Sequence, residues 1–220
     1  MKKDFWLERW ERGEIGFHQD EFNPYLRLYW PNLRLASGST VFVPLCGKSR
    51  DMLWLREQGH QVLGVELSTI AVQAFFEENN CTPQRSIAGK FESHAADGMR
   101  ILRGDFFDLT KTDLANVSAV YDRASMIALP PEMRERYAHH LMDILPPATQ
   151  ILLITIDYPQ PEMDGPPFSV TAEEVTVLYR QHAEVRLLEQ VDVLAQSPRF
   201  QQRGLSRLRE NIFLLERRQS

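Results

Sequence analysis

Residues 40–68 decide the fold of this chain, and they read TVFVPLCGKSRDMLWLREQGHQVLGVELS. The stretch contains two short apolar runs, at 40–43 and 61–66, whose length and β-branched content are typical of buried strands. Between them, residues 51–58 have a helical pattern that stops at Gly59, a residue type that commonly ends helices. A strand, a helix and a second strand in this order predict a parallel βαβ unit.

The same alternation continues toward the C-terminus. Residues 151–156 are apolar without alternation, as expected for a strand that is covered on both faces. The other expected elements are a helix at 69–78, strands at 99–102 and 119–121, and a helix that opens at Pro130 and Pro131. The sequence therefore predicts a doubly wound α/β fold, with a mostly parallel sheet and helices on both faces.

The N-terminal part of the chain departs from this alternation. Residues 4–34 are rich in aromatic side chains and have a helical pattern, with Asp4 as the expected N-cap. Trp6 and Trp10 lie one helical turn apart, so they share a face of that helix. Gly13 and Gly16 interrupt the helical pattern before Phe17 and His18.

The C-terminal part also departs from the alternation. Strand-like runs at 183–193 and 208–215 have only a loop between them, which predicts an antiparallel pair at the sheet edge. The chain contains no repeat and no Ser/Gly-rich linker. We therefore expect one domain over residues 1–220, in which residues 1–34 form a helical lid and residues 39–220 form the α/β core.

Composition narrows the classes of partner. The 220 residues are 43% hydrophobic and 25% charged, as in ordinary globular proteins, and a net charge of −5 gives no positive field for nucleic acid or an anionic membrane. Two cysteines are too few for a disulfide framework or a zinc site, and they suit a reducing compartment. We expect a cytoplasmic, soluble monomer that binds neither nucleic acid nor membranes.

A candidate cofactor site follows from the βαβ unit. In such folds, ligands bind at the carboxyl ends of the strands, and Glu66 ends the second strand. Gly47 precedes it by 19 residues, close to the ~20 that separate a glycine-rich turn from a ribose-binding acid. A carboxylate there can accept hydrogen bonds from both ribose hydroxyls. The alternative is that Glu66 only caps the helix that begins near Ser68.

A phosphate-binding loop does not fit this stretch. Gly47-Lys48-Ser49 resembles the end of a P-loop, but Phe42 stands where that motif needs a glycine. Pro44 removes a backbone donor from the loop, and the chain has no G-x-G-x-x-G motif. An adenosine cofactor without a pyrophosphate fits better, and S-adenosylmethionine is the common one.

Further candidate residues follow later strands. Asp105 and Phe106 come after the expected third strand, where an adenine could stack or hydrogen bond. Arg123, with Asp122 before it, follows the fourth strand and could pair with the carboxylate of the cofactor; a surface ion pair is the alternative. Trp10 could cover the cofactor, since a sulfonium is attracted to aromatic faces, or it could simply anchor its helix to the core.

The histidines do not suggest a metal site. His139 and His140 are neighbours on one helix and point in different directions, whereas shared coordination favours an i, i+4 spacing. His18 follows the Gly-rich break after the first helix and could touch a substrate; a solvated loop histidine is the alternative. We therefore expect no bound metal.

Residues 41–49, continued by 59–68, closely resemble the thiopurine S-methyltransferases. The P-L-C-G-K block at 44–48, followed by G-H-x-V-x-G-V-E at 59–66, is specific to that family. The sequence is most similar to the short bacterial branch, whose members are also linked to methylation of selenium and tellurium compounds. The resemblance extends to Trp6, Trp10, residues 13–19, Trp54, Asp108-Leu109, Asp122-Arg123 and residues 213–215.

The resemblance implies a Rossmann-like class I methyltransferase that moves a methyl group from S-adenosylmethionine to sulfur. It places arginines near the acceptor, here Arg123 and Arg199, although residues 196–203 depart from the animal enzymes. The cofactor contacts that it implies are Trp10, Leu45, Glu66, Asp105, Phe106 and Arg123. The side-chain chemistry of each of these residues except Leu45 also favours such a contact.

The expected reaction is a direct in-line displacement by a thiolate or selenolate. An aromatic thiol is already partly ionised near neutral pH, so no general base is needed, and Arg123 or Arg199 could favour the anion by its charge. We keep two alternatives. The chain could methylate another small-molecule acceptor at oxygen or nitrogen, or it could bind S-adenosylmethionine as a noncatalytic sensor.

Overall fold

The computed structural model describes residues 3–14, 18–19 and 21–218 of the chain. Its contacts divide the chain into two compact units, Met1–Tyr121 and Asp122–Ser220. Gly16 and Phe17, which belong to the segment matched by the family resemblance, lie outside the described residues.

The first unit begins with helices, as the sequence predicts. They are α1 (Lys3–Glu11), α2 (Pro24–Tyr29) and the 3-10 helix η1 (Trp30–Leu33). Because α1 already includes Lys3, Asp4 lies in its first turn, and the prediction that Asp4 is the N-cap is wrong. The cap of α2 is Asn23, whose side chain accepts hydrogen bonds from two backbone N–H groups of the first turn.

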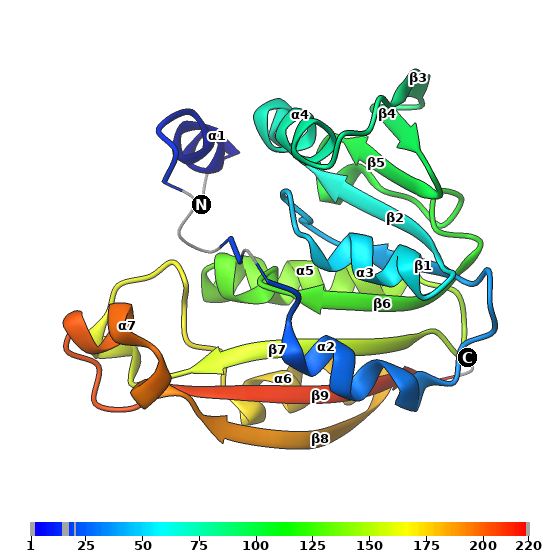
Figure 1. Cartoon of the computed structure of the whole chain (residues 1–220). Helices are drawn as coiled ribbons and strands as arrows, with labels where there is room; N and C mark the ends of the chain where they lie inside the picture. The colour runs from blue at the N-terminus through cyan, green and yellow to red at the C-terminus, as the bar shows by residue number, and fades with distance from the viewer. Residues whose placement is uncertain (1–2, 15–17, 20, 219–220) are drawn as a thin grey trace. The chain divides into compact units, whose positions relative to one another are not determined.

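The sheet of the first unit contains the predicted parallel βαβ unit. Its strand order is β3-β4-β5-β2-β1-β6. β1 pairs in parallel with β2 and β6, and β2 pairs in parallel with β5, so the carboxyl ends of these strands share one edge. The elements are β1 (Thr40–Val43), α3 (Asp51–Glu57), β2 (Gln61–Glu66), α4 (Thr69–Glu78), β3 (Gln84–Ala88), β4 (Phe91–Ala96), β5 (Met99–Arg103), η2 (Phe106–Asp108) and β6 (Val117–Arg123). In Figure 1, α1 lies beside α4.

The sequence analysis did not identify β3 and β4. These antiparallel strands carry mostly exposed and half-buried polar residues, so they lack the apolar pattern of a strand. The turn from β4 to β5 did carry a signal. Asp97 and Gly98 both have positive φ, 49° and 76°, as a two-residue hairpin turn requires, and Asp-Gly is a strong marker of such turns.

The second unit contains the predicted antiparallel pair. β9 (Arg209–Arg217) pairs antiparallel with both β7 (Gln150–Asp157) and β8 (Ala183–Asp192). The connection from β8 to β9 is not only a loop, as had been expected, because it contains η5 (Leu194–Gln196) and α7 (Pro198–Gln202). The remaining elements are η3 (Met126–Ala128), α5 (Pro131–Ile144), η4 (Gln160–Glu162) and α6 (Ala172–Tyr179).

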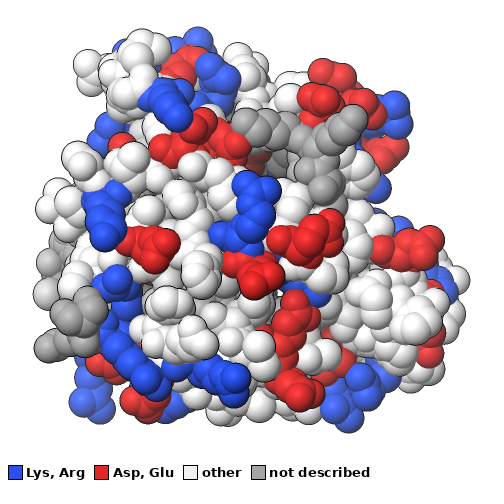
Figure 2. Space-filling model, turned by 180° about the vertical axis from the view of Figure 1, so that it is seen from behind, with Lys and Arg blue, Asp and Glu red and all other residues white. Residues whose placement is uncertain are grey.

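The helices and one face of the molecule can be described in terms of length and charge. Among the described residues, every helix is too short or too polar to cross a bilayer. On the face drawn in Figure 2, basic and acidic side chains are interspersed.

Gly64 lets β2 pack tightly against the loop that follows β1. A Cβ atom added at Gly64 would lie 2.7 Å from the sulfur of Cys46 and 3.3 Å from that of Met52. Both sulfurs belong to buried side chains, so neither can move into solvent without opening the core.

Gly64→Ala is therefore expected to lower the free energy of unfolding by about 1–3 kcal/mol, the usual cost of overpacking, as measured by urea denaturation. The cost should be smaller in a Cys46→Ala background, where the contacted sulfur is absent. An equal cost in both backgrounds would contradict this explanation.

Candidate functional site

The loop between β1 and α3 has an irregular backbone. Leu45 and Gly47 both have positive φ, 44° and 53°. Two hydrogen bonds hold the loop: the Cys46 N–H donates to the carbonyl of Val65 at 3.0 Å, and the Ser49 N–H donates to the carbonyl of Cys46 at 3.0 Å. A left-handed leucine costs roughly 1–2 kcal/mol, and such strain concentrates at functional sites.

The Glu66 side chain connects this loop to α4. Its Oε2 atom accepts from the N–H of Gly47 at 2.9 Å, and its Oε1 atom accepts from the N–H of Ser68 at 2.7 Å. Ser68 is the N-cap of α4, because its hydroxyl accepts from the N–H of Ala71 at 3.2 Å. Glu66 therefore supports the start of the helix, as the alternative interpretation held, and reaches the glycine of the loop as well.

The Glu66 carboxylate also has acceptor capacity of the kind that a ribose contact needs. It is 8% exposed, and burial raises its pKa, while the backbone N–H groups oppose that shift. A carboxylate has about four acceptor positions, and the two N–H groups occupy one on each oxygen. The N–H of Leu67 also favours the ionised carboxylate, and the acceptor positions that remain could take ligand hydroxyls, as the ribose hypothesis requires.

Trp10 packs over the loop from α1. It is 7% exposed, and a Cβ atom added at Gly47 would lie 3.3 Å from Cζ2 of its indole. Trp10 therefore does anchor its helix, and it does so on the loop that carries the cofactor candidates. Trp6, one turn earlier, is only half-buried.

Asp105 and Phe106 lie after β5, and the backbone ties them to Glu66. The N–H of Gly104 donates to the carbonyl of Glu66 at 2.9 Å, which joins the ends of β5 and β2. The Asp105 carboxylate accepts from the N–H of Phe107 at 3.0 Å and so caps η2. The Phe106 side chain is buried.

Two other side chains of the loop have structural roles. Lys48 forms an ion pair with Glu78 at the end of α4, so its ammonium serves the protein rather than a phosphate. Burial and the nearby Glu66 carboxylate raise the pKa of the Cys46 thiol well above its ordinary value. The thiol stays protonated at neutral pH and is a poor nucleophile.

In the second unit, Arg123 ends β6 next to a buried acid. Asp122 is fully buried, and the hydroxyl of Tyr137 donates to its Oδ2 atom at 2.6 Å. Burial raises the pKa of Asp122 to about 6, although the Tyr137 and Ser125 hydroxyls oppose the shift. The sequence analysis named Asp122 only as the neighbour of Arg123 and missed its buried partner.

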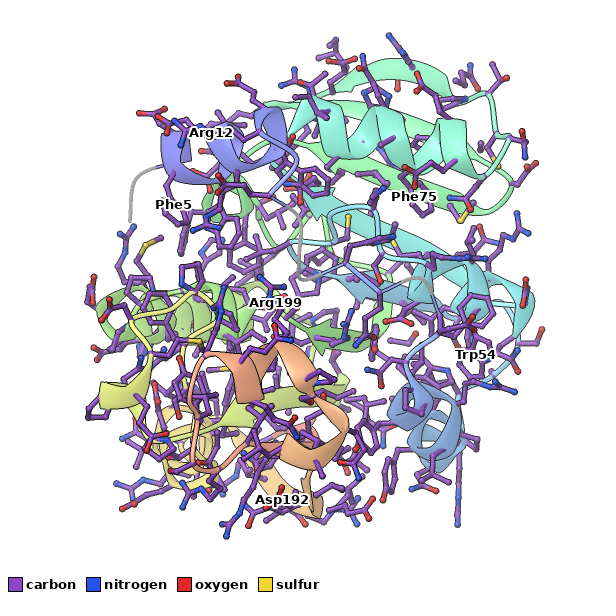
Figure 3. All side chains as sticks on the ribbon, turned by 60° about the vertical axis from the view of Figure 1, so that its left-hand side comes forward. Phe5, Arg12, Trp54, Phe75, Asp192 and Arg199 are labelled. Atoms are coloured by element: carbon purple, nitrogen blue, oxygen red, sulfur yellow. The ribbon has the colours of Figure 1, made fainter. Side chains whose placement is uncertain are left out.

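Arg199 lies on α7, where its side chain is exposed. Figure 3 labels it together with Asp192, the last residue of β8, on opposite sides of α7 in that view. The segment around α7 packs on a buried apolar cluster of Ile156, Tyr158, Leu205 and Leu208, flanked by the partly buried Ile127, Met163, Val193, Leu194 and Phe200.

Two further arginines belong to this region and were not identified from the sequence. Arg203 lies 3.2 Å from the sulfur of Met163 through one guanidinium nitrogen, and Arg207 pairs with Asp157 at 2.7 Å. In the sequence they are visible only as further basic residues after Arg199, and such residues are also common on solvated surfaces.

The histidines have local surroundings. His18 is half-buried in the first unit. The rings of His139 and His182 meet edge to face, with centroids 5.4 Å apart. Across the described residues, no group of three or more His, Cys, Asp or Glu side chains is placed to hold a metal ion.

Solved structures with the same architecture define the class. The chain is similar to a 1,6-didemethyltoxoflavin-N1-methyltransferase from Burkholderia thailandensis, solved with S-adenosylhomocysteine, at a TM-score of 0.65 and 15% identity over 98% of this chain and 87% of that one. It is equally similar to an S-adenosylmethionine-dependent methyltransferase from Anabaena variabilis, at a TM-score of 0.65 and 13% identity over 98% and 94% of the two chains. The fold is that of the Rossmann-like class I methyltransferases.

Sequence relatives define the family. The family model described as thiopurine S-methyltransferase matches residues 1–218. The thiopurine S-methyltransferase of Nitrosospira multiformis is 63% identical over 215 residues, 98% of each chain, and that of Pseudomonas fluorescens strain Pf0-1 is 53% identical over 213 residues, 97% of this chain and 98% of the relative. The chain belongs to the thiopurine S-methyltransferase family and is an S-adenosylmethionine-dependent enzyme.

Asp122 should give the protein a measurable pH dependence of stability. Its pKa rises from 3.8 to about 6 on folding, so the folded state binds the proton more tightly and loses stability as pH rises through that range. The difference in free energy of unfolding between wild type and Asp122→Asn should therefore change by about 3 kcal/mol between pH 3.5 and pH 7, in favour of the variant at higher pH.

Urea denaturation at a series of pH values measures this difference. Asp143→Asn, a change at an exposed position on α5, is the matched control and should differ from wild type by a nearly constant amount. A constant difference for Asp122→Asn as well would contradict the elevated pKa.

Proposed function

We propose that this enzyme transfers the methyl group of S-adenosylmethionine to the sulfur of a small aromatic or heterocyclic thiol such as a thiopurine. Selenium and tellurium species with a comparable nucleophilic atom belong to the same proposal. The observation that carries it is the buried Glu66 carboxylate, bonded to the N–H groups of Gly47 and Ser68 and able to accept two hydroxyls, in a chain of this family.

The cofactor would be held by residues of several loops. In the proposal, Glu66 accepts the ribose hydroxyls, Asp105 and Phe106 contact the adenine, and Arg123 pairs with the carboxylate of the methionine part. The indole of Trp10 covers the sulfonium, which an aromatic face attracts, and Leu45 contributes a backbone or apolar contact from its strained turn. The bound cofactor supplies an electrophilic methyl group.

The acceptor would use arginines and apolar surface. A thiol loses its proton to solvent, its sulfur forms a bond to the methyl carbon, and the bond from that carbon to the sulfonium breaks, leaving S-adenosylhomocysteine. Arg123 and Arg199 favour the thiolate by their charge, and the partly buried Phe200 and Met163 offer apolar contact to an aromatic ring. His18 is a further candidate for orienting the acceptor.

The protein contributes proximity and orientation, which in ideal intramolecular reactions lower barriers by roughly 7–11 kcal/mol. No general base is required for a thiol that is already partly ionised. The N-terminal helix, anchored by Trp10 on the loop, would act as a lid over the ligands. Both cysteines are free thiols, which suits the reducing cytoplasm as the site of action.

The ribose role of Glu66 is tested by calorimetric titration with S-adenosylmethionine and S-adenosylhomocysteine. Glu66→Ala should weaken the binding of both at least tenfold, about 1.4 kcal/mol, because charge-assisted hydrogen bonds are lost. Glu77→Ala removes an exposed acid from α4 and should leave both affinities unchanged. Unchanged affinity in a Glu66→Ala protein that melts cooperatively would refute the assignment.

The charge role of the arginines is tested by the pH dependence of kcat with a saturating aromatic thiol, which reports the pKa of the bound thiol. Arg123→Met and Arg199→Met should each move the acid limb to higher pH, because loss of a nearby cation raises the pKa of the bound thiol. Arg186→Met, on an exposed part of β8, is the control.

The same assay tests the choice of acceptor atom. A phenol and an aniline of the same ring skeleton should be turned over far more slowly than the thiol. If the acid limb of the pH–rate profile stays unshifted in both arginine variants, the electrostatic role is wrong. Equal rates on the thiol, the phenol and the aniline would contradict the preference for sulfur.

A further inference from the structure

A buried carboxylate lies one residue before Arg123, and the proposed reaction gives it no role. Asp122 is fully buried at the end of β6, and no cationic side chain among the described residues contributes to its titration. A buried carboxylate is costly to ionise unless hydrogen bonds hold it, so its presence needs an explanation.

The turn that follows Asp122 is strained. Ala124 has φ 68°, a left-handed conformation that disfavours any residue with a Cβ atom. The hydroxyl of Ser125, which is itself buried, hydrogen bonds to the Asp122 carboxylate across this turn. The four-residue turn from Asp122 to Ser125 is thus closed, and Arg123 lies inside it.

The other side of the turn is also held. Ser125 is followed directly by η3, where its carbonyl accepts from the N–H of Ala128 at 3.1 Å. The carbonyl of Ile127 accepts from the N–H of Phe168 at 2.7 Å. The backbone after Ser125 therefore has a fixed position, and the Asp122 carboxylate fixes the part before it.

Two tyrosines face Asp122 from neighbouring helices. Tyr137 of α5 donates its hydroxyl to Oδ2 at 2.6 Å, and burial together with Asp122 raises the pKa of Tyr137 well above its ordinary value, so it remains a donor. Tyr179 of α6 feels the charge of Asp122, but its hydroxyl lies 3.6 Å from the sulfur of Met126. Of these two tyrosines, Tyr137 is the one whose hydroxyl hydrogen bonds to the Asp122 carboxylate.

We propose that Asp122 is a positioning residue for Arg123: its carboxylate, held by the Tyr137 and Ser125 hydroxyls, keeps the left-handed turn closed and so fixes the direction of the Arg123 guanidinium. The inference rests on the proposed role of Arg123 in binding the carboxylate of the cofactor. The Oδ1 atom of Asp122 has no hydrogen-bond partner among the described residues, so it is the oxygen that takes up the proton. Protonation there weakens Oδ2 as the acceptor of the Tyr137 hydroxyl, and the turn loosens when Asp122 becomes neutral.

The test is the affinity for S-adenosylhomocysteine, measured by calorimetry from pH 5 to pH 8, which needs no acceptor. The wild type should lose affinity as pH falls through about 6, where Asp122 takes up its proton. Tyr137→Phe should move that midpoint to higher pH, because the lost donor lowers the pKa of Asp122 in the wild type. Tyr179→Phe removes an equally buried hydroxyl that does not bond to Asp122, and its midpoint should match the wild type.

The carboxylate itself is tested with Asp122→Asn. This variant should bind S-adenosylhomocysteine about tenfold more weakly at pH 7.5, which corresponds to the loss of one charge-assisted hydrogen bond between Arg123 and the carboxylate of the ligand. Its affinity should not vary between pH 5 and pH 8. In an Arg123→Met background, Asp122→Asn should have no further effect, because a positioning residue acts through the group that it positions. Thermal unfolding of each variant confirms that it is folded.

A wild-type affinity that is flat with pH, or a Tyr137→Phe midpoint equal to that of Tyr179→Phe, would overturn the proposal. So would a pH-dependent affinity that persists in Arg123→Met. The proposed function fails separately, when the wild type binds S-adenosylhomocysteine normally and methylates no thiol.

Discussion

The Glu66 carboxylate is the contact on which the first unit's candidate site depends. The two carboxylate oxygens accept from the N–H groups of Gly47 and Ser68, and the backbone carbonyl of Glu66 accepts from the N–H of Gly104. One residue therefore sets the position of three chain segments that follow β1, β2 and β5. Because these bonds use backbone groups, the carboxylate is held in place before any ligand binds, which would lower the ordering cost of the proposed ribose contact.

Glu66 and Asp122, two of the buried acids among the described residues, are held in different ways, and this difference separates their properties. Glu66 is held by backbone N–H groups, which no substitution of the donor residue removes short of proline. Asp122 is held by the hydroxyls of Tyr137 and Ser125, which single substitutions remove. The first arrangement therefore resists change in sequence, whereas in the second a substitution at Tyr137 or Ser125 changes the pH at which the acid ionises.

Much of the fold could be predicted from the sequence, since its strands carry their own pattern. The β-branched runs of β1 and β2 and the stop at Gly59 predicted the parallel unit, and the 19-residue spacing pointed to Glu66. The hairpin of β3 and β4 was missed, because the exposed β3 and the half-buried β4 have no apolar periodicity. Leu45 came from the family resemblance alone: nothing in a leucine signals positive φ. The Asp122–Tyr137 pair joins a strand to a helix and exists only through tertiary packing.

The packing of Trp10 on Gly47 has a consequence for the order of folding. The surface that receives the indole requires the loop after β1 in its final shape, and that shape depends on Glu66, far along the chain from α1. Until residues up to Ser68 are in place, α1 has no partner for its aromatic face, and a helix of this length is marginal alone in water. Helix α1 is thus expected to pack late in folding, after the βαβ unit has formed.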